Sequence, residues 1–189
     1  TPWFRYWTDL PRLDFRFITA DTAQKTQEHN DYSVLQCWGR SIVGEAVLID
    51  QLRGKWEAPE LLVQARGFWF KHKDSHATKL RTMMVEDKAS GTGLVQTLRR
   101  EGVAILPVQR SRDKVSRAHD AAPFIESGNV LLPQDASWLS DLLDESASFP
   151  GGSHDDQLDP MFDAVAYVQR APSTADRDDG KTLPTANRW

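Results

Sequence analysis

An apolar stretch near the start of the chain, Phe15 to Ala20, leads directly into the carboxylate of Asp21. An ionised acid at the end of a buried strand is unusual, because removing its charge from water without a partner is costly. The fold must therefore place a counter-charge there, and a divalent metal ion is one candidate. Two further acidic sites, Glu86-Asp87 and Asp155-Asp156, also lie at the ends of apolar segments. We interpret the three sites as meeting in space around metal.

Each acid has a simpler interpretation when it is taken alone. Asp21 could form a local turn, Glu86 could be a solvated charge at a strand end, and Asp155 or Asp156 could cap a helix. Because all three acidic sites lie at the ends of strands or helices, we favour one shared site over three unrelated local roles.

Composition limits the class of protein. A chain of 189 residues with 40% hydrophobic and 26% charged residues is typical of one soluble globular domain. The single cysteine, Cys37, excludes an internal disulfide and predicts a small core residue. No apolar run is long enough to span a membrane, so we expect no membrane partner.

The opening strands are joined too briefly to be parallel. Strand-like residues at Phe15–Ala20 are followed by Tyr32–Arg40 and Ala46–Leu52, and Gly39 and Gly44 bracket the second connection. Short connections require antiparallel neighbours. The sequence therefore predicts a three-stranded antiparallel meander.

Helices and strands alternate in the rest of the chain. Helical patterns follow Pro59 and cover Leu94–Arg100, Arg112–Glu126, Trp138–Asp144 and Asp155–Gln169, while strand patterns cover Thr82–Val85, Val103–Val108 and Asn129–Leu132. This order predicts an α/β fold whose mixed sheet carries helices on both faces. We expect residues 1–14 to be an aromatic N-terminal arm, residues 15–170 the folded domain, and residues 171–189 a polar, flexible tail.

Charge is distributed unevenly. The net charge is −4, yet the segment from Gln64 to Asp120 holds 12 Lys and Arg against 6 Asp and Glu. A basic segment beside gathered acids is compatible with a polyanion on one face, although solvated helix surfaces give the same count.

Oxygen ligands of the kind at these three sites suit Mg²⁺ or Mn²⁺ better than zinc. Asp155 and Asp156 remain rivals for the inner position, since adjacent acids point in different directions. Asp87 is a similar alternative to Glu86. Asp31 is a further candidate near the cluster, or a turn residue.

Four motifs, in order, resemble those of the nuclease domain of phage large terminase subunits. They are Asp21-Thr-Ala-Gln-Lys25 with Asn30-Asp-Tyr-Ser33, Val85 to Leu94, the basic Arg112 to Ala118, and Gly152-Ser-His-Asp-Asp-Gln-Leu158. The resemblance covers about residues 15–167 and implies a ribonuclease H-like fold. It also implies a metal-dependent endonuclease that cuts concatemeric double-stranded DNA by two-metal-ion hydrolysis.

By this resemblance, Asp21 is the shared metal ligand, and Glu86 and Asp156 complete the catalytic set. Lys25, Lys88, Lys114 and Arg117 become candidates for contacts with DNA phosphates; a solvated surface pair is the alternative for the last two. The family implies an ATPase motor domain in the same chain, which residues 1–14 would join. Portal and small terminase subunit are the implied partners, in the cytoplasm of an infected bacterium.

Two other functions compete with this one. A junction resolvase is another nuclease with the same fold. A non-catalytic module that binds DNA or docks on the portal belongs to a different class, and clustered carboxylates disfavour it because they repel phosphates.

Overall fold

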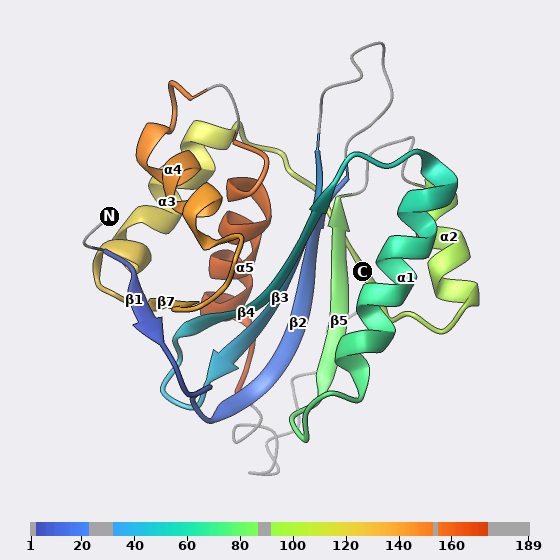
Figure 1. Ribbon diagram of the computed structural model, residues 1–189, viewed down its shortest axis with the longest axis horizontal. Coiled ribbons are helices and arrows are strands. Elements are labelled where there is room, and N and C mark those ends of the chain that lie inside the picture. Colours follow the sequence, from blue (N-terminus) through green and yellow to red (C-terminus); the bar gives the residue numbers. More distant parts are fainter. Residues whose placement is uncertain (1–2, 23–31, 87–91, 153–154, 174–189) are drawn as a thin grey trace, which may run out of the picture.

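The computed structural model describes residues 3–22, 32–86, 92–152 and 155–173. A mixed seven-stranded sheet in the order β1-β7-β4-β3-β2-β5-β6 forms its centre (Figure 1). Helices α1 and α2 cover one face, and α3, α4 and α5 cover the other (Figure 1). The α/β class predicted from the sequence is confirmed. The strands are β1 (Arg5–Trp7), β2 (Leu13–Asp21), β3 (Ser33–Ser41), β4 (Ala46–Gly54), β5 (Leu80–Glu86), β6 (Ile105–Val108) and β7 (Val130–Pro133). The helices are α1 (Ala58–Lys73), α2 (Thr92–Arg100), α3 (Lys114–Glu126), α4 (Leu139–Ser148) and α5 (Leu158–Arg170).

The predicted meander is present as β2, β3 and β4, which pair antiparallel in sequence order. A tight turn joins β3 to β4, and Gly44 adopts a φ of 94° there, a conformation that side chains disfavour. After the meander, α1 forms the crossover connection that leads to β5, and β5 pairs parallel with β2. Strand β6 then extends this edge by pairing parallel with β5.

A short strand near the N-terminus, β1, is part of the sheet. Strand β1 pairs parallel with β7, and Phe4 lies buried in the main core. We expected an arm over residues 1–14, but Phe4 is buried and Arg5–Trp7 form a strand of the sheet instead. The reason is that β7 leaves an open edge, which another strand can cover.

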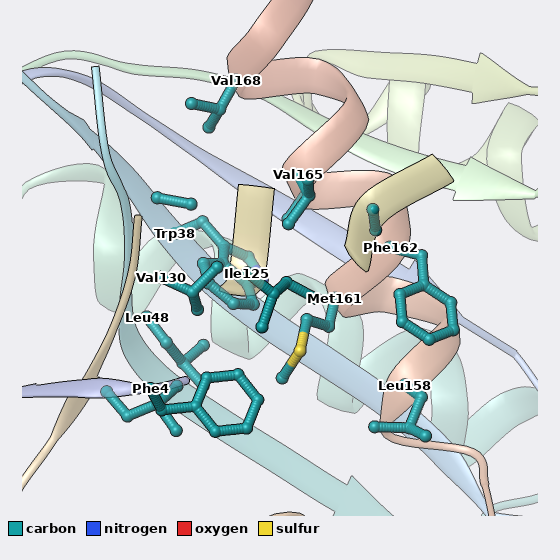
Figure 2. Packing of buried hydrophobic residues seen from close by; sticks show 14 of the residues in the cluster. Phe4, Trp38, Leu48, Ile125, Val130, Leu158, Met161, Phe162, Val165 and Val168 are labelled. Atoms are coloured by element: carbon teal, nitrogen blue, oxygen red, sulfur yellow. The ribbon is translucent and has the colours of Figure 1, made fainter. Parts of the chain in front are cut away.

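The two faces of β2 enter different cores. Phe15 and Phe17 pack against α5, whereas Ile18 and Ala20 pack against the α1 side. Side chains alternate along a strand, so this pattern follows from sequence spacing alone. Figure 2 shows the α5 side, where Met161 and Val165 are buried in the same cluster as Trp38, Leu48 and Ile125. Cys37 is buried in β3, as predicted, and burial raises its pKa to about 12.

The last helix begins later than the sequence pattern predicted. We expected it from Asp155, but α5 starts at Leu158, and Asp155 and Asp156 lie in the preceding turn. Pro160 explains the difference, because a proline lacks the N–H needed beyond the first helical turn. No helix in the described ranges is long and apolar enough to cross a membrane.

A polar cluster ties β4 to α1 and makes stability depend on pH. Asp50 Oδ2 accepts from Lys71 Nζ at 2.8 Å and lies 2.8 Å from His72 Nε2. Burial raises the pKa of Asp50, but the hydrogen bonds with His72 and Lys71 outweigh it and bring that pKa below its ordinary value. A carboxyl group whose pKa is lowered by folding stabilises the fold at pH values above its pKa in the unfolded chain. This contribution is lost as the pH falls through the pKa in the folded protein.

We therefore expect Asp50→Asn to lower the free energy of unfolding at about pH 7, with a smaller loss at about pH 3.5, where the wild-type acid begins to protonate. Urea titrations of both proteins at each pH measure this. An equal loss at the two pH values would contradict the role of the Asp50 charge.

Candidate metal centre

Asp21 and Glu86 are the last residues of two parallel neighbouring strands, β2 and β5. The register pairs Ala20 with Val85, one residue before each acid. Alternation then places Asp21 on the same face as Phe17, and Glu86 on the same face as Met84, which belong to the core beneath α5. The two acids therefore meet at one corner of the sheet, facing α5.

Arg110 lies between them. Its Nη1 donates to Asp21 Oδ1 at 2.8 Å and to Glu86 Oε2 at 2.9 Å. The same guanidinium donates from Nη2 and Nε to Asp163 Oδ2, at 2.7 and 3.2 Å. Its side chain is only 6% exposed. Burial lowers the pKa of Arg110, but the charges of Asp21 and Asp163 more than reverse this, so the group stays cationic.

Helix α5 contributes two acids at helical spacing. Asp159 and Asp163 are four residues apart, so they share a face, and both side chains are 9% exposed. Asp159 Oδ2 lies 3.8 Å from Arg110 Nη1. Burial raises the pKa of Asp163, while Arg110 acts in the opposite direction. We call Asp21, Glu86, Asp159 and Asp163 the acidic centre.

Lys114 and Arg117, on the first turns of α3, share a face as the sequence predicted. Lys114 Nζ lies 2.7 Å from Asp155 Oδ1 and 2.9 Å from Asp159 Oδ2. Arg117 contacts Asp159 and lies 3.6 Å from Asp163 Oδ1. The alternative of a solvated surface pair is wrong, since both cations form ion pairs with the acids around α5. Their contact with DNA stays a prediction.

The two rival acids diverge, as expected for adjacent residues. Asp155 faces Lys114, whereas Asp156 Oδ2 lies 3.9 Å from Arg53 Nη2. Burial and then the nearby Glu145 raise the pKa of Asp156, and Asp21 acts in the same direction. Asp156 is thus within the electrostatic field of the acidic centre, although the α5 acids that contact Arg110 are Asp159 and Asp163.

A buried amide network fixes this turn to the sheet. Gln36 Nε2 donates to Gln51 Oε1 at 2.7 Å and to Gln157 O at 3.0 Å. Gln51 Nε2 donates to Gln157 Oε1 at 2.5 Å, and Gln157 N donates to Glu145 Oε2 at 3.1 Å. The network ties the turn that carries Asp155 and Asp156 to β3, β4 and α4.

Four of the residues selected from the sequence, Lys25, Asp31, Asp87 and Lys88, lie outside the described residues. Sequence analysis missed Arg110, Asp159 and Asp163. Arg110 and Arg112 both lie in the connection from β6 to α3, so only the path of the chain distinguishes Arg110. The α5 acids did carry a signal, because two acids at a spacing of four interrupt an apolar helix.

The acidic centre fits a divalent cation by its chemistry. Carboxylate oxygens are the ligands that Mg²⁺ and Mn²⁺ prefer. One nitrogen of Arg110 is already shared by Asp21 and Glu86, so both acids can contact a single positive group. Among the described residues, however, no three acid, histidine or cysteine side chains form a ready-made metal site.

Comparison with solved structures gives the fold's relatives. The chain is similar to the large terminase of a thermophilic bacteriophage, with a TM-score of 0.61 and 14% identity over 87% of this chain and 42% of that one. It is also similar to the large terminase nuclease of the thermophilic phage G20c. The zinc-bound form gives a TM-score of 0.60 and 20% identity, covering 88% of this chain and 85% of that one. The magnesium-bound form of that nuclease gives a TM-score of 0.61 and 18% identity, covering 88% of this chain and 85% of that one.

The human cytomegalovirus terminase nuclease domain is a further relative, with a TM-score of 0.68 and 13% identity over 86% of this chain and 89% of that one. The chain thus spans less than half the length of the first of these terminases and most of the length of the separate nuclease domains. No curated protein sequence matches it. The terminase RNase H-like domain family matches residues 18–167. With about four-fifths of its sequence matched and a ribonuclease H-like sheet in place, the chain belongs to the terminase RNase H-like domain family.

Proposed function

We propose that this domain is a metal-dependent endonuclease that cuts double-stranded DNA. The observation that carries the proposal is the convergence of Asp21 and Glu86 from parallel strand ends onto one cationic group. Family membership supports a nuclease, and the magnesium and zinc in the G20c nuclease structures support a divalent ion.

Asp21 and Glu86 would hold the metal, with a third acid from the turn before α5 or from α5 itself. Asp156 is our choice from the sequence, with Asp155 as its alternative, and Asp159 and Asp163 are added by the geometry. When bound, a pair of divalent ions supplies an activated water and stabilises the leaving oxygen of a phosphodiester. The acids would orient that pair, and their partial burial would strengthen the attraction.

Lys114 and Arg117 both form ion pairs with Asp159 of the acidic centre. We propose that they contact DNA phosphates without reading sequence, as basic side chains commonly do. In a full-length terminase, the DNA would be a viral concatemer cut during packaging in the host cytoplasm. An ATPase motor in the same chain, the portal and the small subunit would then be the partners.

Replacing Lys114 by glutamine is expected to weaken DNA binding and to reduce the slope of log affinity against log salt by about 0.9, the value for one lost phosphate contact. The measurement is fluorescence anisotropy with a short duplex in Ca²⁺, at several salt concentrations. Arg12→Gln is the matched control, because Arg12 is exposed near the opposite end of β2. An unchanged slope for Lys114→Gln would mean that Lys114 does not contact a DNA phosphate and serves only in its ion pairs with Asp155 and Asp159.

Plasmid cleavage tests the proposal itself. Supercoiled plasmid is incubated with the domain in Mn²⁺, Mg²⁺ or EDTA. Nicking or linearisation in either metal, abolished by EDTA, is the expected result. Binding of DNA with no cleavage in either metal would favour a non-catalytic module. Cleavage confined to four-way junctions would favour a resolvase.

A further inference from the structure

Arg110 bridges the two strand-end acids, Asp21 and Glu86, that would hold the metal ion. Its Nη1 lies 2.8 Å from Asp21 Oδ1 and 2.9 Å from Glu86 Oε2, and its side chain is 6% exposed. We propose that Arg110 is a cation held between Asp21 and Glu86, and that a divalent metal binds by displacing its Nη1 from these two acids. This inference rests on the metal site proposed above and adds a regulation of that site.

The two cations exclude each other for electrostatic and steric reasons. Magnesium binds carboxylate oxygens at about 2.0–2.1 Å and demands near-octahedral ligands. A guanidinium nitrogen in contact with the same two oxygens would occupy part of that shell, and like charges so close repel strongly at a buried site. Metal binding is therefore an exchange at Asp21 and Glu86, rather than an addition to them.

The other edge of the guanidinium provides a pivot. Nε and Nη2 of Arg110 both donate to Asp163 Oδ2, at 3.2 and 2.7 Å. Rotation about this contact withdraws Nη1 while Arg110 keeps one carboxylate partner. The charge of Arg110 thus stays paired on α5 after the exchange, which lowers the cost of leaving the strand-end acids.

The structure also has room for this movement. A cavity of about 590 Å³ is lined by Arg110 itself, together with Ser111, Asp120, Asp163 and Tyr167. It lies between β6, α3 and α5, next to the acidic centre. Ser111 adds a polar residue to this lining, whereas Asp120 is already paired with Arg112.

Displacement predicts a measurable penalty on metal affinity. If Arg110 leaves the acids in fewer than about one in ten metal-free molecules, the apparent dissociation constant rises at least about tenfold over its intrinsic value. The acidic centre would then remain charge-compensated at low metal concentration. Removing Arg110 should restore the intrinsic affinity.

Mn²⁺ titration followed by electron paramagnetic resonance of the free ion tests this, using the 189-residue chain without DNA. We expect Arg110→Gln to bind Mn²⁺ at least about tenfold more tightly than the wild type. Arg112→Gln is the matched control, because it removes the same charge two residues away from a side chain that is 57% exposed. Its affinity should stay within about twofold of the wild type, as expected for an exposed surface charge.

The outcomes separate the two proposals. Arg110→Gln binding Mn²⁺ no more tightly than the wild type would overturn displacement and leave the proposed nuclease intact. If the wild type and Arg110→Gln are both folded and neither shows saturable Mn²⁺ binding, the displacement and the proposed metal-dependent nuclease are both overturned.

A second measurement needs no variant at the site and serves if Arg110→Gln fails to fold. The guanidinium resonances of Arg110 in ¹⁵N-labelled wild type should shift at saturating Mg²⁺, while those of Arg112 stay in place. Unchanged Arg110 resonances at saturation would overturn displacement.

Discussion

Replacing Asp21 by asparagine is expected to lower metal-dependent DNA cleavage about 10²–10³-fold, since a metal ion contributes several kcal/mol of charge stabilisation and each 1.4 kcal/mol or so is tenfold in rate. Asp21 ends β2 and contacts the shared Arg110 nitrogen, so it lies at the centre of the proposed site. Asparagine keeps the shape of the side chain but removes the charge that attracts metal. Initial rates of plasmid nicking in Mn²⁺ measure the effect.

Asp14→Asn is the matched control for this variant. Asp14 lies on the same strand and forms an ion pair with Arg40 at 3.0 Å, but it is seven residues from Asp21. At about 3.3 Å per residue, the two acids are separated by roughly 23 Å. Cleavage by Asp14→Asn should match the wild type, and equal losses in both variants would mean that the fold, rather than the site, had failed.

The largest expected effect on stability comes from a residue outside the site. Arg16 is a charged side chain of β2 that is 1% exposed, on the face toward α1. Its guanidinium donates to the carbonyl oxygens of His72, Thr78 and His76, at 2.8, 2.9 and 3.2 Å, and to Ser75 Oγ at 3.1 Å. Arg16 thereby provides hydrogen-bond donors to acceptors at the end of α1 and in the connection into β5. It also orients the strand that carries Glu86.

Arg16→Met keeps much of the side-chain volume but leaves these acceptors without their donor. We expect the free energy of unfolding to fall by about 3–4 kcal/mol, because hydrogen bonds from charged groups are worth about 1.5–3 kcal/mol each and are not fully additive. Arg12→Met, an exposed arginine four residues earlier, should cost less than about 0.5 kcal/mol. Guanidinium chloride unfolding of the three proteins gives the comparison. A loss below about 1 kcal/mol for Arg16→Met would mean that water replaces the arginine at little cost.

Local sequence patterns predicted the parts of the fold that depend on local rules. Short connections with glycine predicted the antiparallel meander, and apolar runs ending at Asp21 and Glu86 predicted strand ends that prove to be neighbours. The place of β1 was not predictable in this way, since its partner β7 lies more than a hundred residues further along the chain.

The candidate site was predictable only in outline for the same reason. Arg110 reaches Asp21 across 89 residues and Asp163 across 53, through a connection whose path no local pattern defines. The buried network likewise joins Gln36 and Gln51, on the adjacent strands β3 and β4, to Gln157, which lies 121 and 106 residues further along the chain. Pairings of this kind depend on the packing of α5 on the sheet, which no local pattern defines.

Crystals of the domain grown or soaked in Mn²⁺ test the central claim most directly, because anomalous scattering locates the ion without relying on activity. The account predicts an anomalous peak in contact with the carboxylates of both Asp21 and Glu86, completed by an acid from α5 or the turn before it. Ordered Mn²⁺ bound elsewhere, with no peak beside Asp21 and Glu86 at saturating metal, would contradict it.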